Sequence, residues 1–206
     1  MHTPGKIVCI GRNYVAHAKE LGNAVPERPL IFLKPPSAVI GAGEAIILPA
    51  QSSRVEHEGE IGVVIGRRAR HVAESEALAV IAGYAALNDV TARDLQRLDV
   101  QFTRAKSFDT FCPIGPEADA AEVDWRSLEV ICRVNDEVRQ HGRAADMVFG
   151  IPALVAFITA VMTLEPGDVI ATGTPEGVGP LAAGDTVEVE LPGLSRVANP
   201  VRTDRS

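Results

Sequence analysis

The sequence predicts a mixed α+β fold that is mostly β, largely antiparallel, with a few short helices. Three observations support this prediction. Short apolar runs of β-type composition outnumber helical segments, the helical segments do not alternate regularly with strands, and no internal repeat is present. This pattern argues against a doubly wound parallel sheet. The 206 residues are 46% hydrophobic and 23% charged, which indicates one globular domain over residues 1–206.

The first third of the chain contains short strands and one helix. Residues 6–11 (KIVCIG) form a predicted strand that ends at a glycine. Residues 13–22 (NYVAHAKELG) favour a helix, with Asn13 as a candidate N-cap and Gly22 as a C-terminal stop. Further strands are predicted by apolar runs at 30–35, 45–49 and 60–66.

The middle of the chain is less regular. Residues 79–89 (AVIAGYAALND) predict a strand or a helix followed by a strand, and residues 91–99 predict a short helix capped by Thr91 or Asp89. Residues 106–116 (KSFDTFCPIGP) contain proline and glycine and predict an irregular segment.

The last third begins with a predicted hairpin over residues 127–142, whose two alternating runs join at Asn135-Asp136. The strongest helix is predicted over 150–168, with Pro152 near its start and Pro166-Gly167 beyond its end. Strands follow at VIATGT and TVEVEL, and the remaining residues are predicted to be a frayed polar tail.

Charge and cysteine content narrow the classes of function. The net charge is −7, the pI is near 5.3, and lysine and arginine are dispersed, so binding to nucleic acid or to an anionic membrane surface is not expected. Three scattered cysteines argue against a disulfide framework or a zinc ribbon. No apolar run approaches the roughly 20 residues of a membrane-spanning helix, and the N-terminal apolar run is too short for a signal peptide. We expect a cytoplasmic protein.

Two glutamates stand two residues apart in the run RVEHEGEIGVVIG. Side chains alternate along a strand, so Glu58 and Glu60 are expected on the same face, where a cation must lie between them or one must hold a proton. Together with Asp89, at the end of a neighbouring strand, they suit Mg²⁺ or Mn²⁺. The alternative is a solvated strand edge, with Asp89 as a helix cap. His57 is expected on the opposite face, as a residue that supports the ligands from behind or packs in the core rather than as a ligand.

Three further residues could take part in chemistry. His17 and Glu20 are neighbours on one helix face, where a carboxylate could orient an imidazole that acts as a general base; the alternative is a surface pair. Lys106 could bind a substrate carboxylate, or it could be a solvated surface lysine. The loop TGTPEGVGP offers the hydroxyls of Thr172 and Thr174, but it lacks the spacing of a phosphate-binding loop.

Six motifs occur in an order that resembles the fumarylacetoacetate hydrolase family, especially its short, single-domain, acylpyruvase-like bacterial members. The resemblance extends from about residue 6 to residue 190, and the motifs are IGRNYVAHAKELG, FLKPPSAVIG, VEHEGEIGVVIG, GYAALNDVTARDLQ, RAKSFDTFCPIGP and LEPGDVIATGTPEGVGP. It implies a mixed β-sandwich-like roll, usually a homodimer, with one divalent metal ion per subunit. The stretch 97–104 is shorter than in similar acylpyruvases, and the chain stops soon after the last strand, which leaves the substrate open.

The resemblance also implies roles for individual residues. These are metal binding by Glu58, Glu60 and Asp89, water activation by His17 and Glu20 on a lid helix within residues 11–25, an active-site role for Lys106, and pocket positions for Arg12, Gln96 and Thr174. The resulting hypothesis is hydrolysis of a C–C bond in a 2,4-dioxo acid such as fumarylpyruvate or acetylpyruvate, with pyruvate as one product. The alternatives are decarboxylation or tautomerisation of oxaloacetate, isomerisation of a hydroxymuconate-type diacid, and a metal-dependent binding protein without turnover.

Overall fold

The computed structural model describes residues 3–121 and 123–204, and its largest sheet runs through the middle of the molecule. The strand order in this sheet is β10-β7-β6-β13-β1-β2, and β1 and β13 are its parallel pair. The strands are β1 (Ile7–Gly11), β2 (Leu30–Lys34), β6 (Gly59–Ile65), β7 (Ile81–Asn88), β10 (Ala118–Asp119) and β13 (Val169–Ala171). The mostly β, α+β fold predicted from the sequence is therefore confirmed.

A second sheet of five strands has the order β12-β11-β15-β16-β4. Its strands are β4 (Ile46–Leu48), β11 (Glu129–Val134), β12 (Glu137–Arg143), β15 (Thr186–Leu191) and β16 (Ser195–Thr203). The predicted hairpin is confirmed: Asn135 and Asp136 form its turn with φ values of 51° and 66°, which suits the right-handed twist of the strands. The prediction of a frayed tail was wrong, because β16 pairs with both β15 and β4.

Two small sheets, one of two strands and one of three, accompany the two large ones. They are β3 (Val39–Ile40) with β9 (Cys112–Pro113), and β5 (Val55–His57) with β8 (Thr91–Ala92) and β14 (Gly179–Pro180). The α-helices are α1 (Val15–Glu20), α2 (Arg93–Leu98), α3 (Thr103–Lys106) and α4 (Ile151–Val161). Single 3₁₀ turns or short 3₁₀ helices lie at Pro36–Ala38, Glu74–Val80, Trp125–Ser127 and Ala144–Asp146. None of the described helices is long and apolar enough to cross a membrane.

The predicted helix caps were wrong, although the helices themselves are present. Helix α1 follows Tyr14 rather than Asn13, and the Asn13 amide instead binds the carbonyls of Phe149 and Thr172. Helix α2 follows Ala92, while the Thr91 hydroxyl donates to the Asp89 carbonyl. In both cases a long-range or local contact uses the side chain that was expected to cap the helix. Gly22 does terminate α1, with φ of 69°.

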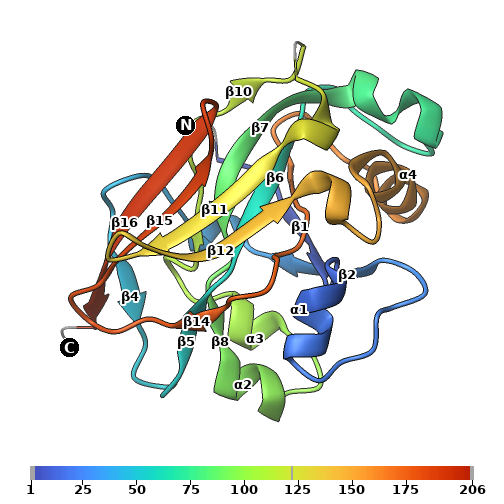
Figure 1. The fold of residues 1–206 in the computed structure, drawn as a ribbon. Coiled ribbons are helices and arrows are strands. Elements are labelled where there is room, and N and C mark those ends of the chain that lie inside the picture. The colour runs from blue at the N-terminus through green and yellow to red at the C-terminus, as the bar shows by residue number, and fades with distance from the viewer. Residues whose placement is uncertain (1–2, 122, 205–206) are drawn as a thin grey trace.

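The hydrophobic core lies between the two sheets, which Figure 1 shows one in front of the other. Alternating side chains of β6 and β7, such as Ile61, Val63 and Tyr84, face this core together with Val130 and Val189 of the second sheet. Helix α4 lies beside the Glu74–Val80 segment at one edge. A smaller cluster that includes Ile7, Cys9, Leu87 and Cys112 covers the other face of the large sheet.

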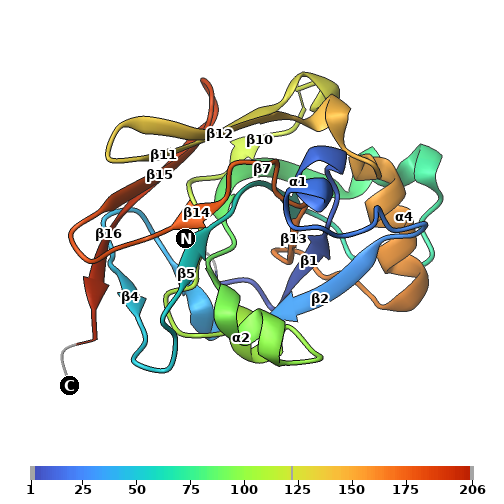
Figure 2. The same cartoon turned by 60° about the horizontal axis from the view of Figure 1, so that its bottom comes forward.

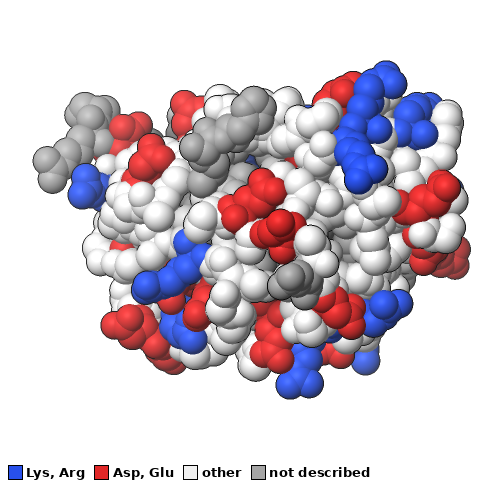
Figure 3. Space-filling model, turned by 90° about the horizontal axis from the view of Figure 1, so that it is seen from above, with Lys and Arg blue, Asp and Glu red and all other residues white. Residues whose placement is uncertain are grey.

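Helices α1, α2 and α3 all lie at one end of the molecule, which Figure 2 turns toward the viewer. Helix α1 follows β1 in the chain, and α2 and α3 follow β8. Residues of all three helices line one cavity at this end of the molecule. On the face drawn in Figure 3, acidic and basic side chains are interspersed, and the described residues form no broad basic field there. The charge distribution on this face therefore agrees with the low isoelectric point.

Candidate active site

Three carboxylates meet at the end of the large sheet. Glu58 connects β5 to β6, Glu60 lies in β6, and Asp89 directly follows β7, whose pairing with β6 aligns the three residues. The Asp89 amide donates to the Glu58 carbonyl at 2.9 Å, which fixes the two backbones together. One ligand atom from each side chain lies within 4.8 Å of the others, and all three residues are buried. The structure thus brings together the three residues proposed as metal ligands.

Cationic side chains surround two of these acids. The Lys106 ammonium donates to Glu58 Oε2 at 2.7 Å and to Asp89 Oδ2 at 2.5 Å. The Arg93 guanidinium binds the other oxygen of Glu58, and the Lys34 ammonium donates to Asp89 Oδ1 at 2.6 Å. Lys106 was predicted to have an active-site role in which it could bind a substrate carboxylate, and it lines the same pocket while it binds the acids. It is not a solvated surface lysine.

The surroundings shift the pKa values of Glu58 and Glu60 in opposite directions. Burial would raise the pKa of Glu58, but Lys106 and Arg93 outweigh burial and hold its pKa below the usual range. Burial raises the pKa of Glu60, and the charges of Asp89 and Glu58 raise it further. The only hydrogen bond described for the Glu60 carboxylate comes from the Gly173 amide, at 2.8 Å. Within the described residues, no cationic side chain lies within ion-pair distance of Glu60.

The donor set fits a divalent cation. Three carboxylates supply hard oxygen ligands, which Mg²⁺ and Mn²⁺ prefer, and a cation beside Glu60 would relieve the buried repulsion that raises its pKa.

His57 is not part of this cluster. Its Nδ1 lies 3.1 Å from Gln140 Oε1 on the other side of the strand, in agreement with its predicted packing role.

The histidine proposed as a base faces the same space from α1. His17 is buried, and its Nδ1 lies 3.3 Å from Glu20 Oε2. The other oxygen of Glu20 accepts a hydrogen bond from the Gly177 amide at 3.0 Å, which ties α1 to the loop between β13 and β14. With Nδ1 directed toward the carboxylate, His17 Nε2 is the nitrogen left for a ligand.

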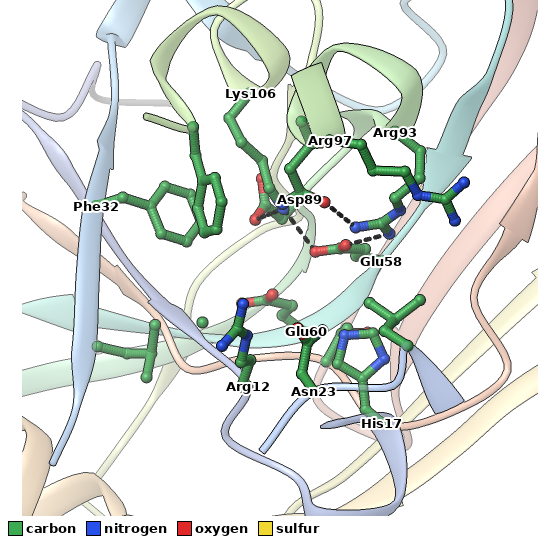
Figure 4. A pocket seen from close by; sticks show the side chains of 16 residues that line it. Arg12, His17, Asn23, Phe32, Glu58, Glu60, Asp89, Arg93, Arg97 and Lys106 are labelled. Carbon is green, nitrogen blue, oxygen red and sulfur yellow. Dashed lines mark hydrogen bonds and ion pairs between the residues drawn. The ribbon is translucent and has the colours of Figure 1, made fainter. Parts of the chain in front are cut away.

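A cavity of about 240 Å³ lies between α1 and the α2–α3 pair. Every proposed site residue except Glu20 lines it, including Arg12, Gln96 and Thr174. In Figure 4 the labelled cationic and polar residues approach the acids from two sides, with Arg93, Arg97 and Lys106 on the side of α2 and α3, and Arg12, His17 and Asn23 on the side of α1. Arg12 holds a left-handed backbone, with φ of 59°.

Sequence patterns did not identify the residues that support the acids. Lys34 ends an otherwise apolar strand, and Arg93 begins a short helix, where basic residues are unremarkable. Arg93 Nε also donates to Glu56 Oε2 at 2.7 Å, and its Nη1 donates to Gln96 Oε1 at 2.6 Å. Because 35 and 55 residues separate Arg93 from Glu58 and Lys34 from Asp89, only the folded chain shows these pairs. The one local signal in the sequence that could have identified Lys34 is its position in an otherwise apolar strand.

Comparisons with known proteins identify the family of this chain. The family model described as fumarylacetoacetate (FAA) hydrolase C-terminal matches residues 6–202. The mitochondrial oxaloacetate tautomerase FAHD1 of Arabidopsis thaliana is 49% identical over 197 residues, which are 93% of this chain and 88% of the plant protein.

Two solved structures are similar to nearly the whole of this chain. The 5-carboxymethyl-2-hydroxymuconate delta-isomerase of Mycobacterium smegmatis has a TM-score of 0.91 and 47% identity, covering 99% of this chain and 81% of that protein. The 2-hydroxyhepta-2,4-diene-1,7-dioate isomerase of Mycobacterium marinum has a TM-score of 0.90 and 45% identity, covering 99% and 77% of the two chains. With the family match over nearly the whole chain, these similarities establish that the protein belongs to the fumarylacetoacetate hydrolase family.

Proposed function

We propose that the protein is a divalent-metal-dependent enzyme that moves a proton in a 2-oxo acid with a second carboxylate, as in keto–enol tautomerisation of oxaloacetate. The observation that carries the proposal is the buried set of Glu58, Glu60 and Asp89 in one cavity with a carboxylate-bound histidine. The names of similar proteins support the reaction class, since they denote a tautomerase of oxaloacetate and isomerases of unsaturated diacids.

A divalent cation, Mg²⁺ or Mn²⁺, would be held by Glu58, Glu60 and Asp89, and when bound it supplies Lewis-acid stabilisation of negative charge on a substrate oxygen. The remaining chemistry belongs to side chains. Arg12 and Lys106 place positive charge in the cavity, which favours an anionic substrate. In this proposal these charges orient a 2-oxo acid by its charged end, and C3 is the position that the base acts on.

His17 is proposed as the group that carries the proton. Its Nε2 accepts a proton from C3 of the keto form, the electron pair of the C–H bond becomes the C2–C3 double bond, and the π pair of the C2 carbonyl moves onto its oxygen. His17 then gives up this proton, either to the oxygen on C2 or to solvent while solvent protonates that oxygen, which completes the enol and returns His17 to its starting form. Glu20 holds the opposite nitrogen and stabilises the imidazolium during the transfer.

A second candidate, hydrolysis of an acylpyruvate, follows from the same pair of residues. A histidine oriented by a carboxylate can take a proton from water as readily as from carbon, and the attack of that water on C4 would release pyruvate. The cavity of about 240 Å³ has room for a small diacid or an acylpyruvate. The two reactions differ in product, so an assay can separate them.

The experiment measures both products from the native protein. Oxaloacetate enol is followed by ultraviolet absorbance against a buffer blank, and pyruvate release is followed with acetylpyruvate and fumarylpyruvate, each with Mg²⁺, with Mn²⁺ and with excess EDTA. We expect metal-dependent acceleration of tautomerisation, lost in His17→Ala. Metal-dependent pyruvate release without tautomerisation would favour the second candidate, and the absence of both reactions would contradict the proposal.

A further inference from the structure

A glutamine from the second sheet reaches the candidate active site. Gln140 lies in β12, is buried, and has hydrogen-bond partners at both ends of its amide. Its Oε1 accepts from the Gly59 amide at 2.9 Å and lies 3.1 Å from His57 Nδ1. Its Nε2 donates to Thr174 Oγ1 at 2.7 Å and to the Pro175 carbonyl at 2.8 Å. Gln140 therefore connects the segment between Glu58 and Glu60 with the loop that carries Thr174.

Backbone groups fix the orientation of this amide. The Gly59 N–H can only donate, so it requires the amide oxygen, and the Pro175 carbonyl can only accept, so it requires the amide nitrogen. Exchanging the two amide atoms would break both hydrogen bonds. Gln140 therefore presents an N–H, and not an oxygen, to the Thr174 hydroxyl.

The hydrogen-bond roles of the Thr174 hydroxyl follow from its two neighbours. Its proton is directed to the Gly59 carbonyl at 2.9 Å, because that oxygen is an acceptor. One of its lone pairs receives the Gln140 N–H. A hydroxyl has one donor and two acceptor positions, so the one position that these two neighbours leave unused is a lone pair.

This lone pair differs from the cationic groups of the cavity and adds to the acceptors that Glu58, Glu60 and Asp89 supply. Thr174 lines the cavity beside Glu60, since the preceding residue, Gly173, donates its N–H to the Glu60 carboxylate. Arg12, Arg93 and Lys106 line the same cavity, and their side chains only donate. A carboxylate oxygen of a ligand can bind these donors, but it would meet repulsion at Thr174. An O–H group would be accepted there.

We propose that Gln140 is a positioning residue that holds Thr174 as a hydrogen-bond acceptor toward the cavity, and that Thr174 selects an O–H donor. This second proposal rests on the proposed function and specifies it further. The O–H donor is either the enol hydroxyl of the substrate or a water molecule. Thr174 then distinguishes the protonated, enol-like form of a 2-oxo acid from its fully ionised analogues.

The test compares two small ligands that differ in this donor. Glycolate carries a hydroxyl beside its carboxylate, whereas oxalate at neutral pH carries oxygens that only accept. Their affinities are measured by calorimetry with saturating Mg²⁺ for the native protein, Thr174→Val and Thr174→Ser. Valine keeps the shape and removes the acceptor, and serine restores it. We expect Thr174→Val to weaken glycolate by about fivefold and oxalate by less than about twofold, which corresponds to one lost hydrogen bond.

The outcomes separate the two sources of the donor. A selective loss of glycolate affinity, restored by serine, supports a substrate hydroxyl. Unchanged affinities for both ligands, with turnover that falls in the valine variant and recovers in the serine variant, support a water molecule. Equal losses for both ligands, a larger loss for oxalate, or no change in either affinity or turnover would overturn the proposal.

The role of Gln140 is tested with Gln140→Met, with Gln51→Met at an exposed position as the matched control. Freed from the amide, the Thr174 hydroxyl can rotate, so the ratio of glycolate to oxalate affinity should fall toward that of Thr174→Val. A lower melting temperature with an unchanged affinity ratio would show that Gln140 has only a structural role and would contradict the proposal.

Because binding is measured without turnover, a native protein that binds both ligands but turns over no 2-oxo acid would contradict only the proposed function. If neither ligand binds, both proposals fail.

Discussion

Glu58 and Glu60 carry the same group two residues apart, yet they occupy different electrostatic environments. Lys106 and Arg93 bind both oxygens of Glu58, so this side chain stays ionised. Glu60 is equally buried, and burial together with Asp89 and Glu58 favours its protonated form. The conflict expected from the sequence is therefore resolved in two ways at once, by cations at one glutamate and by a raised pKa at the other.

This difference predicts how Glu60→Gln should behave. Without metal, the variant should melt at the native temperature or above it, because an uncharged amide removes a buried repulsion. With Mg²⁺ at about 100 times its Kd, the native protein should gain about 2.7 kcal/mol, or roughly 5–10 °C, and the variant should gain much less. Differential scanning fluorimetry with Mg²⁺ and with EDTA measures both values.

The exposed Glu74→Gln serves as the control for this experiment, and it should keep the full response to Mg²⁺. Glu58→Gln should differ from both variants, because it removes the carboxylate charge that Lys106 and Arg93 share, leaves each with one charged partner, and lowers stability even in EDTA. An undiminished Mg²⁺ response in Glu60→Gln would argue against this residue as a ligand.

At the scale of single residues, the sequence predicted the acids but not what surrounds them. Alternation along a strand placed Glu58 and Glu60 together, and a strand end placed Asp89 beside them, because these are local rules. Lys34 and Gln140 reach the site across the fold, and neither has a sequence neighbour that signals it. Such contacts depend on how β2 and β12 pack, which periodicity does not specify.

At the scale of elements, the loop between β13 and β14 holds α1 in place. The Gly177 amide donates to Glu20, and Gly177 itself has φ of +95°, with the Arg139 carbonyl occupying the space that a Cβ would need. The loop therefore requires glycine for two reasons, backbone conformation and lack of space. Since Glu20 also contacts His17, the geometry of the proposed base depends on this loop.

Gly177→Ala is predicted to destabilise the protein more than Gly184→Ala. Gly184 has nearly the same conformation, φ of +98°, but nothing lies within 4 Å of the point where its Cβ would stand, so it measures the conformational cost alone, about 1–2 kcal/mol. Gly177→Ala adds a steric clash, which should raise the loss by a further 1–3 kcal/mol or so. Urea denaturation followed by circular dichroism measures both, and equal losses would contradict the prediction.

Hydrogen bonds from Ser52 and Ser53 to the Asp94 carboxylate of helix α2 should stabilise the fold to a degree that depends on pH. Burial raises the pKa of Asp94, but hydrogen bonds from Ser52 and Ser53 outweigh burial and lower it to about 2. The ordinary value is about 3.9, so these contacts stabilise the fold above about pH 4, and that contribution disappears as the pH falls toward 2. Asp94→Asn should therefore be less stable than the native protein near neutral pH, with a difference that narrows in acid.

The measurement is the urea midpoint of both proteins from about pH 7 to pH 2. Ser53→Ala is a useful companion, because it removes one donor and leaves the carboxylate in place. It should show a smaller difference with the same direction of pH dependence. A gap between Asp94→Asn and the native protein that stays constant over the whole range would exclude the carboxylate charge as its cause.

Elements with local signals were predicted, and those without them were not. The hairpin at Asn135-Asp136 was predicted because its turn residues favour positive φ. The tail was mistaken for irregular chain because residues 195–203 contain Pro200 and several polar side chains. Its inward positions, such as Val197 and Val201, alternate with exposed ones, but the core they pack against is formed by distant segments.

At the scale of the whole molecule, β16 holds the second sheet together. It pairs with β15 on one side and with β4 on the other, so it links the last part of the chain with residues 46–48. The Asn199 amide adds hydrogen bonds to the carbonyls of Gly41 and Glu44. Through β15 and β11, the same sheet carries β12 and Gln140, so its stability bears on the site as well.

Val201→Ala is therefore predicted to destabilise the whole fold, whereas Arg202→Ala should not. Val201 is buried and lies opposite Ile46 of β4, so losing two methyl groups there should cost about 2 kcal/mol, including the cavity left behind. Arg202 is the adjacent exposed residue of the same strand, and its truncation should change stability by less than about 0.5 kcal/mol. Urea unfolding curves give both values. Equal small losses would mean that the C-terminal strand is not part of the cooperative core.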